Sequence, residues 1–143
     1  MPKVSVTVIT LNEAENIAAA LETVSWADEI IVVDSHSTDA TVDRARRFTD
    51  RVVVRDWPGY AAQKNHAASL ARNDWILSID ADKRVSPELA DELKALLATE
   101  PTARGYRIPR VTFHLGRWIR STDWFPDYKL RLYDRRAGAW AGQ

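Results

Sequence analysis

The chain has 143 residues, of which 45% are hydrophobic and 28% are charged, as in a single soluble globular domain. It contains no cysteine, which excludes disulfides, thiolate metal sites and cysteine nucleophiles. Residues 1–103 carry 11 Lys and Arg against 17 Asp and Glu, whereas residues 104–143 carry 9 against 3, so a net charge of zero conceals an acidic and a basic part. No apolar run is long enough for a signal peptide or a membrane span, and we expect a cytoplasmic location.

Strand and helix patterns alternate from the N-terminus. Runs of β-branched and apolar residues predict strands at residues 4–10, 29–33, 51–55 and 75–79. Strands that are separated by helices imply right-handed βαβ crossovers and a mainly parallel sheet. We therefore expect an α/β fold.

A helical pattern follows each of these strands. The first, residues 12–24, opens with a capping box, and Ser37 or Asp39 caps the second. Residues 61–71 are rich in alanine, and Ser86 precedes a proline as the N-cap of a fourth helix with one leucine-rich face. These patterns predict one helix after every strand.

The pattern changes after residue 101. Residues 105–113 and 129–134 alternate charged and apolar side chains, which predicts antiparallel strands added to the sheet. Residues 116–128 are aromatic and charged, and we expect a loop near the bound ligand. This basic part either contacts anionic lipid at the inner face of the membrane or a phosphorylated acceptor, or simply packs on the acidic part.

Polar or acidic groups follow each of the first four predicted strands: Asn12 and Glu13, Asp34, Asp56, and Asp80 with Asp82. Ligands of open α/β sheets bind outside the carboxyl ends of the strands. We therefore expect these groups to share one ligand site.

The most specific chemistry is that of Asp80 and Asp82. If the backbone there is extended, both carboxylates point the same way and can share a divalent cation. Oxygen ligands without cysteine or a histidine cluster favour Mg²⁺ or Mn²⁺, which such sites commonly bind together with substrate phosphates. The alternative is an ordinary surface loop.

Three further side chains have two interpretations each. Asp34 and Glu13 are suited to accept hydrogen bonds from a nucleotide base or ribose, or they serve only the local structure. Lys64 either balances phosphate charge or is simply solvated. We expect Asp34 to contact the ligand and Asp39 to be structural.

Four segments, in their order along the chain, resemble those of the family 2 glycosyltransferases. They are residues 8–13 (VITLNE), 33–41 (VDSHSTDAT), 63–65 (QKN) and 77–82 (LSIDAD). The segments WFPD and KLRL near the C-terminus resemble the bacterial group that includes the lipopolysaccharide core β-1,4-glucosyltransferases. The resemblance implies the GT-A (nucleotide-diphospho-sugar transferase) fold, a three-layer α/β/α sandwich with antiparallel C-terminal additions. Residues 1–103 would form the donor-binding part, and residues 104–143 a partial acceptor-side part of the same domain.

Carried over residue by residue, the resemblance implies a donor-binding set of Thr10, Asn12, Glu13, Asp34, Lys64 and Asp80. In this set Thr10 and Glu13 lie along the nucleotide and Asp34 recognises uracil. Asp80 lies near the ribose and the metal, and Asp82 coordinates the metal, Mg²⁺ or Mn²⁺, that bridges the diphosphate.

The implied reaction is an inverting transfer of a hexose from a UDP-sugar to a cell-envelope glycan or lipid-linked acceptor, with no nucleic acid as partner. A general base deprotonates the acceptor hydroxyl, which attacks the anomeric carbon, and the metal stabilises the leaving group.

Two positions depart from the family pattern. Lys83 stands where similar proteins usually have an acid, so either the metal affinity falls or Lys83 points into solvent. Similar proteins also continue into a Val-His-Glu stretch with an acid suited to the base role, whereas this chain stops at Gln143. We therefore expect a C-terminally truncated protein whose base is unidentified, with Asp123 and Asp127 as the remaining local acids. The alternative function is a non-catalytic nucleotide-sugar-binding fragment or interaction module.

Overall fold

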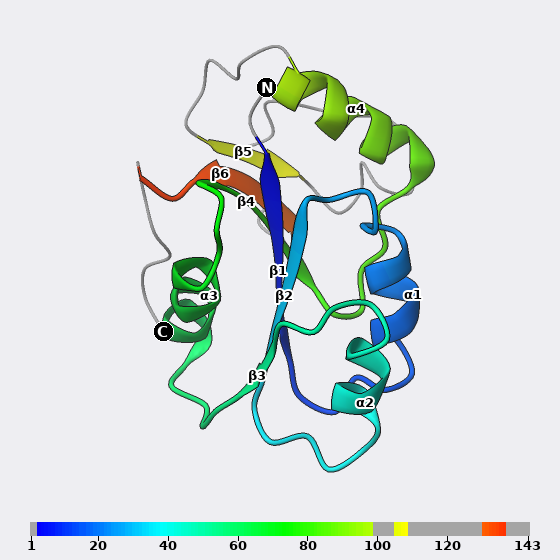
Figure 1. The fold of residues 1–143 in the computed structure, drawn as a ribbon, viewed down its shortest axis with the longest axis vertical. Coiled ribbons are helices and arrows are strands. Elements are labelled where there is room, and N and C mark those ends of the chain that lie inside the picture. The colour runs from blue at the N-terminus through cyan, green and yellow to red at the C-terminus, as the bar shows by residue number, and fades with distance from the viewer. Residues whose placement is uncertain (1–2, 99–104, 109–129, 137–143) are drawn as a thin grey trace.

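The computed structural model describes residues 3–98, 105–108 and 130–136. Its centre is a six-stranded sheet with the order β3-β2-β1-β4-β6-β5 (Figure 1). The strands are β1 (Val4–Thr10), β2 (Glu29–Asp34), β3 (Val52–Val54), β4 (Trp75–Asp80), β5 (Gly105–Ile108) and β6 (Leu130–Asp134). The first four are parallel, while β6 runs antiparallel to both β4 and β5. The predicted mainly parallel sheet with antiparallel C-terminal additions is thus confirmed.

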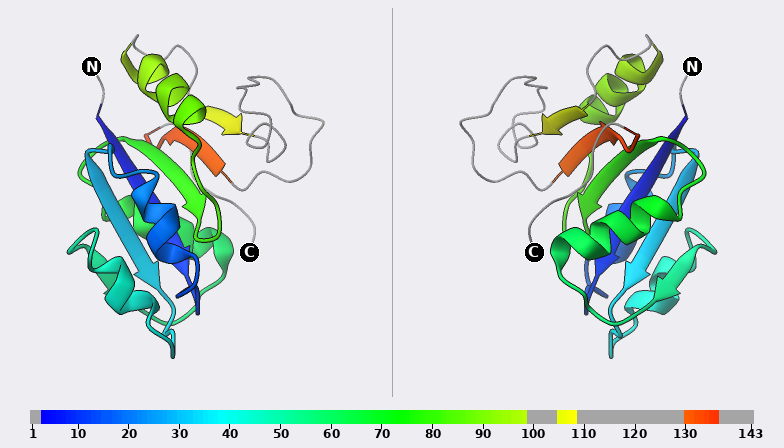
Figure 2. Two further views of the ribbon diagram at one scale, coloured as in Figure 1. Left: turned by 90° about the vertical axis from the view of Figure 1, so that its right-hand side faces the viewer. Right: turned by 90° about the vertical axis from the view of Figure 1, so that its left-hand side faces the viewer.

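Helices cover both faces of this sheet and complete three layers. They are α1 (Ile17–Glu22), α2 (Thr41–Ala45), α3 (Tyr60–Ser69) and α4 (Pro87–Ala98). The helices α1, α2 and α4 lie on one face and α3 on the other (Figures 1 and 2). The chain moves outward from β1 to β3 and then returns past β1 to β4, so right-handed crossovers put α3 opposite α1 and α2. No helix in these described segments is long and apolar enough to cross a bilayer.

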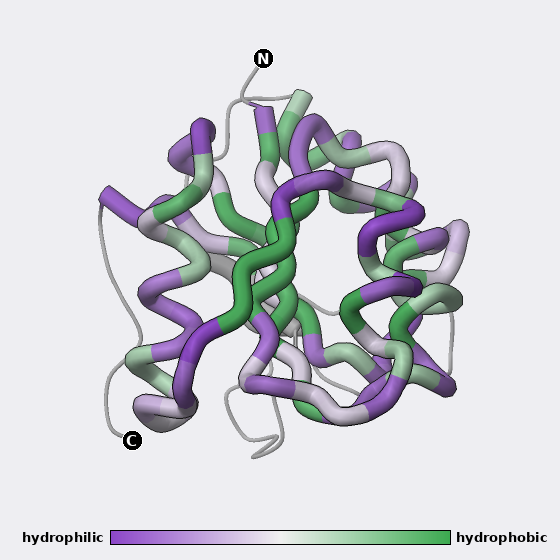
Figure 3. The backbone as a smooth tube through the Cα atoms, turned by 60° about the horizontal axis from the view of Figure 1, so that its bottom comes forward, coloured by the Kyte–Doolittle hydropathy of each residue, from purple (hydrophilic) through white to green (hydrophobic). Residues whose placement is uncertain are grey.

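The core lies on both sides of the parallel strands, because alternate residues of each strand face opposite helices. Val32 faces the α1 side and Ile31 and Val33 face the α3 side, and none of the three is exposed. Figure 3 shows apolar segments concentrated in the central strands and hydrophilic ones in the outer helices and loops. Burial on both faces explains why these strands read as continuous apolar runs.

Helix starts differ from the sequence prediction in two places. The capping box predicted at Asn12 is wrong: α1 begins only at Ile17, and the Asn12 side-chain oxygen instead accepts a hydrogen bond from the Thr38 N–H at 2.8 Å. Neither Ser37 nor Asp39 occupies the N-cap position of α2, which is Ala40, although the Asp39 carboxylate accepts a hydrogen bond from the N–H of Thr41, the first residue of this helix, at 3.0 Å. Both predicted caps are used in contacts between loops, which short-range spacing does not reveal.

The cap of α4 is confirmed. The Ser86 hydroxyl accepts a hydrogen bond from the Leu89 N–H at 3.1 Å, and Leu89, Leu93 and Leu97 are buried on the predicted face.

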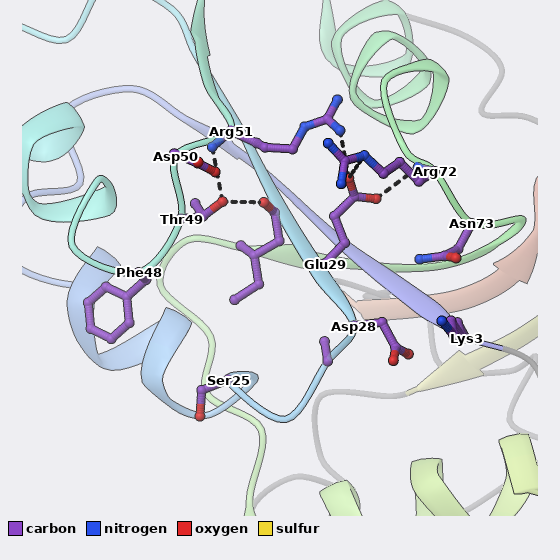
Figure 4. A pocket seen from close by; sticks show the side chains of 12 residues that line it. Lys3, Ser25, Asp28, Glu29, Phe48, Thr49, Asp50, Arg51, Arg72 and Asn73 are labelled. Atoms are coloured by element: carbon purple, nitrogen blue, oxygen red, sulfur yellow. Dashed lines mark hydrogen bonds and ion pairs between the residues drawn. The ribbon is translucent and has the colours of Figure 1, made fainter.

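The amino-end edge of the sheet is held by an ion-pair network around Glu29 (Figure 4). The Glu29 side chain is 8% exposed and lies 2.8 Å from the guanidinium of Arg51. It also accepts hydrogen bonds from the Ser5 hydroxyl and the Arg72 N–H, each at 2.8 Å. Glu29, Arg51 and Arg72 line a hollow of about 750 Å³, in which the Glu29 carboxylate pairs with both guanidinium groups.

Two arginines from distant segments bind carbonyl groups at the C-terminal end of α3 and just after it. Arg51 donates to the Leu70 carbonyl at 2.6 Å, and Arg135 donates to the Ala68 and Ala71 carbonyls at 2.8 Å. The last carbonyls of a helix lack intrahelical partners and carry partial negative charge, so guanidinium groups stabilise this end. The network therefore fixes α3 against β3 and β6.

Replacing Glu29 by alanine should destabilise the fold. Arg51, Arg72 and Ser5 would lose their shared acceptor, and because Arg51 is partly exposed we expect a loss of about 2 kcal/mol in the free energy of unfolding rather than the larger cost of a fully buried pair. Urea titration followed by circular dichroism measures this. Asp50→Ala, which removes an exposed acid beside the same hollow, is the control and should change stability by less than about 0.5 kcal/mol. Equal stabilities of the two variants would contradict the structural role of Glu29.

Candidate functional site

The carboxyl ends of β1, β2 and β4 meet at one edge of the sheet. Thr10 of β1 is paired in register with Asp34 of β2, and Ile9 is paired with Asp80 of β4. The strand order reverses at this point, because β2 lies on one side of β1 and β4 on the other. Such a switch point leaves a crevice between two diverging loops, which is where open α/β sheets bind ligands.

A pocket of about 580 Å³ occupies this crevice. It is lined by Ile9, Thr10, Leu11, Glu13, Trp57, Tyr60, Asp80, Ala81 and Asp82. Four of the predicted site residues, Thr10, Glu13, Asp80 and Asp82, therefore lie around one cavity. The larger hollow at the opposite edge is a less suitable ligand site, because its buried carboxylate, Glu29, already pairs with Arg51 and Arg72.

Asp34 lies beneath this pocket and does not line it. It is 0% exposed, and its carboxylate accepts hydrogen bonds from the Thr10 hydroxyl at 2.6 Å, the Ser37 hydroxyl at 2.6 Å and the Ser37 N–H at 2.7 Å. In the described structure its contacts hold Thr10 and the loop after β2 together. The role of Asp34 in uracil recognition stays a prediction.

The loops after β1 and β2 are joined by further hydrogen bonds. The backbone N–H of Asn12 donates to the Ser37 hydroxyl at 2.7 Å, and that of Glu13 donates to the Thr41 hydroxyl at 2.8 Å. Asn12 and His36 both have positive φ angles, 54° and 58°, in the left-handed region that suits asparagine and is less common for histidine. Asn12 is exposed but does not line the pocket, so in this arrangement it supports the loop beside Glu13.

The same junction explains Asp39. It accepts hydrogen bonds from the hydroxyl and the N–H of Thr41 and from the Ala14 N–H. The Thr41 hydroxyl is the main cause of a lowered pKa of Asp39, because it stabilises the ionised carboxylate. These contacts agree with the expectation that Asp39 is structural.

The backbone at Asp80 and Asp82 is not extended. Asp80 ends β4, and a turn follows in which the Lys83 N–H donates to the Asp80 carbonyl at 3.0 Å. The sequence prediction that the two carboxylates point the same way depended on an extended backbone, and the backbone here turns instead. Both residues nevertheless line the same pocket.

Lys83 does not extend into solvent. Its side chain is only 12% exposed, and its ammonium nitrogen lies 3.3 Å from a carboxylate oxygen of Asp82, which is 49% exposed. Of the two alternatives for this departure from the family pattern, the solvated lysine is therefore wrong. The Lys83 ammonium group instead contacts Asp82, a candidate metal ligand.

The donor set suits a divalent cation that is completed by a substrate. Within the described segments, no group of three or more acidic, histidine or cysteine side chains gathers in one place. Mg²⁺ sites at nucleotides commonly take one or two carboxylates and obtain further oxygens from phosphate and water. Asp80 and Asp82 fit such a site.

Two aromatic residues of the pocket were not predicted. Trp57 and Tyr60 are 44% and 63% exposed, and their rings meet edge to face with centroids 4.8 Å apart. Gly59 between them has a φ of 113°, which a residue without Cβ adopts readily. The sequence signal was available: two aromatics flank a Pro-Gly turn directly after a strand.

Other predicted residues lie elsewhere. Lys64 is half-buried in α3 and is not among the described residues around the pocket. The acids Asp123 and Asp127 lie outside the described residues, as does the predicted loop 116–128.

Comparison with known proteins gives a consistent result. Residues 5–141 match the family model described as Glycosyl transferase family 2. An uncharacterized glycosyltransferase of Rickettsia felis is 46% identical over 80% of this chain, and the lipopolysaccharide core biosynthesis glycosyltransferase LpsC of Rhizobium meliloti is 32% identical over 92%. The chain spans 41% and 50% of these two relatives, respectively.

Solved structures agree with the fold. A mannosyltransferase of Pyrobaculum calidifontis, determined with GDP-Man and Mn²⁺, is 26% identical with a TM-score of 0.72, and the match covers 98% of this chain and 48% of that one. Glucosyl-3-phosphoglycerate synthase of Mycobacterium tuberculosis, determined with Mg²⁺ and UDP, has a TM-score of 0.74 at 22% identity, covering 94% of this chain and 57% of that one. With its mainly parallel sheet and antiparallel C-terminal strands, this chain has the GT-A fold and belongs to glycosyl transferase family 2.

Proposed function

We propose that the chain forms the donor-binding part of a glycosyltransferase that moves a hexose from a UDP-sugar to a cell-envelope glycan or a lipid-linked acceptor. The observation that carries this proposal is the pocket at the switch point, where Thr10, Glu13, Asp80 and Asp82 lie around one cavity. Membership of the family supports sugar transfer. The likeness to LpsC, named for lipopolysaccharide core biosynthesis, supports a cell-envelope acceptor.

In this proposal residues 1–103 bind the donor, and residues 104–143 contribute to the acceptor side of the same domain. The basic composition of the latter part favours an anionic acceptor or peripheral contact with the inner face of a membrane. Acceptor attack on the anomeric carbon with inversion requires a general base. Asp123 and Asp127 are candidates, as is a residue of a longer protein.

Thr10 is well placed to orient the nucleotide. Its hydroxyl donates its only hydrogen to Asp34, so the lone pairs of the hydroxyl oxygen are left to accept a hydrogen bond from a base or ribose in the pocket. Trp57 and Tyr60 supply an apolar wall against which a planar base or a sugar ring can pack. Glu13 lines the same cavity and offers a carboxylate to ribose hydroxyls.

Asp80 and Asp82 are the proposed ligands of Mg²⁺ or Mn²⁺. The mannosyltransferase structure determined with GDP-Man and Mn²⁺ supports divalent metal use in this fold. The bound metal supplies positive charge where the leaving diphosphate accumulates negative charge. The two aspartates hold their oxygen atoms at the end of β4, so they fix where that charge acts.

Calorimetric titration of UDP in the presence of Mn²⁺ tests the donor site. UDP should bind the chain in Mn²⁺ and bind more weakly in EDTA, with ADP and GDP as nucleotide controls. Asp82→Ala should weaken UDP binding in Mn²⁺ by about tenfold or more, because a charge-assisted contact contributes about 1.5–3 kcal/mol. Asp56→Ala is the matched control, since this exposed acid also follows a strand end but does not line the pocket.

If UDP fails to bind the folded chain in Mn²⁺, or binds equally well to the Asp82→Ala variant, the proposed site is wrong. Binding without any sugar transfer to supplied acceptors would instead favour the non-catalytic nucleotide-sugar-binding function.

Replacing Thr10 by valine should affect both stability and binding. The variant keeps the shape of the side chain but leaves Asp34 without one of its donors in a fully buried place, so we expect about 1–3 kcal/mol lower free energy of unfolding. UDP affinity should fall as well, because the hydroxyl acceptor is lost. Urea unfolding and calorimetry measure the two effects, and Thr10→Ser should retain most of both. A valine variant with unchanged UDP affinity would contradict contact between Thr10 and the nucleotide.

A further inference from the structure

Lys83 is an unusual neighbour for a metal ligand, and its position is determined by the backbone. The turn after β4 is closed by the hydrogen bond from the Lys83 N–H to the Asp80 carbonyl, at 3.0 Å. This turn places Lys83 beside Asp82 on the same tight segment. The lysine is thus held near the carboxylates by the fold and not only by the flexibility of its side chain.

The two side chains differ in their exposure to solvent. Surface lysines commonly leave the ammonium group in water, whereas the Lys83 side chain is 12% exposed. Asp82 is 49% exposed and is the more accessible partner of the 3.3 Å contact. Asp82 lines the pocket and Lys83 does not, so an entering cation or anion meets Asp82 first and then the ammonium group 3.3 Å from it.

The contact changes the charge that an incoming cation meets. Asp80 and Asp82 together carry two negative charges, and Lys83 compensates one of them. A divalent cation that binds Asp82 must displace the ammonium group or accept its repulsion at short range. An arriving nucleotide diphosphate has the opposite effect, because its phosphate oxygens offer the ammonium group a new anionic partner.

We propose that Lys83 is a tethered counter-ion of Asp82 that keeps the affinity for a free divalent cation low and releases Asp82 when a nucleotide diphosphate binds. The metal then enters together with the donor, and the two ligands increase each other's affinity. This inference rests on the proposed function, since it takes Asp82 as the metal ligand. Reciprocity of binding makes it measurable from either ligand.

The experiment is a titration of Mn²⁺ with and without saturating UDP, followed by the electron paramagnetic resonance signal of free hydrated Mn²⁺. The full chain is compared with Lys83→Ala, Lys83→Arg and Arg84→Ala. Arg84→Ala is the matched control, because it removes the same charge from the exposed neighbouring residue. Thermal unfolding of every variant verifies that the fold is retained.

Lys83→Ala should bind Mn²⁺ alone about five- to tenfold more tightly than the unchanged chain, as expected for loss of one competing charge at a half-exposed site. UDP should then enhance Mn²⁺ binding less than it does in the unchanged chain. In EDTA, UDP should bind Lys83→Ala more weakly, because the partner of its phosphates is missing. Lys83→Arg and Arg84→Ala should resemble the unchanged chain.

The outcomes separate the two proposals. Equal Mn²⁺ affinity and equal UDP enhancement in Lys83→Ala and the unchanged chain would overturn the counter-ion role, while loss of binding in Asp82→Ala would still support the donor site. Failure of Mn²⁺ and UDP to bind any folded variant would overturn both.

Discussion

The buried carboxylate of Asp34 is the interaction on which the candidate site depends. A fully buried acid is costly unless its oxygens are satisfied, and here Thr10 and Ser37 supply three donors. These donors come from the end of β1 and from the loop after β2. The requirement to satisfy one carboxylate therefore aligns two strand ends, and the loops that leave them are pinned to each other through Asn12 and Thr38.

Topology supplies the rest of the site. Because the chain builds outward through β2 and β3 and then returns to the other side of β1, the loops after β1 and β4 diverge and leave a hollow between them. The turn after β4 contributes both a pair of acids and the lysine that compensates one of them. The two acids and the lysine thus belong to the same short segment, whereas the aromatic wall of the pocket comes from the turn after β3.

The strands were predictable because their signals are local. A strand buried on both faces is typically a near-continuous apolar run, and the Ile-Ile-Val-Val run of β2 shows it plainly. Parallel strands whose carboxyl ends share one edge predicted that Glu13, Asp80 and Asp82 gather, and the family resemblance added Thr10. The same reasoning also predicted Asn12, Asp34 and Asp56 at this site, and these three do not line the pocket. The start of α1 was not predictable, since the Asn12 side chain contacts Thr38, 26 residues away. The turn at Asp80 and the direction of the Lys83 side chain depend in the same way on contacts that spacing does not encode.

The place of β6 in the sheet has a consequence for how the chain reaches its structure during synthesis. It fills the gap between β4 and β5, and its Leu132 is 0% exposed in the core. Until residues 130–136 leave the ribosome, β4 has one unpaired apolar edge, and the end of α3 lacks the guanidinium of Arg135. Unpaired edges of this kind attract other chains. The nascent chain therefore exposes this edge of β4 until the later segment has been translated.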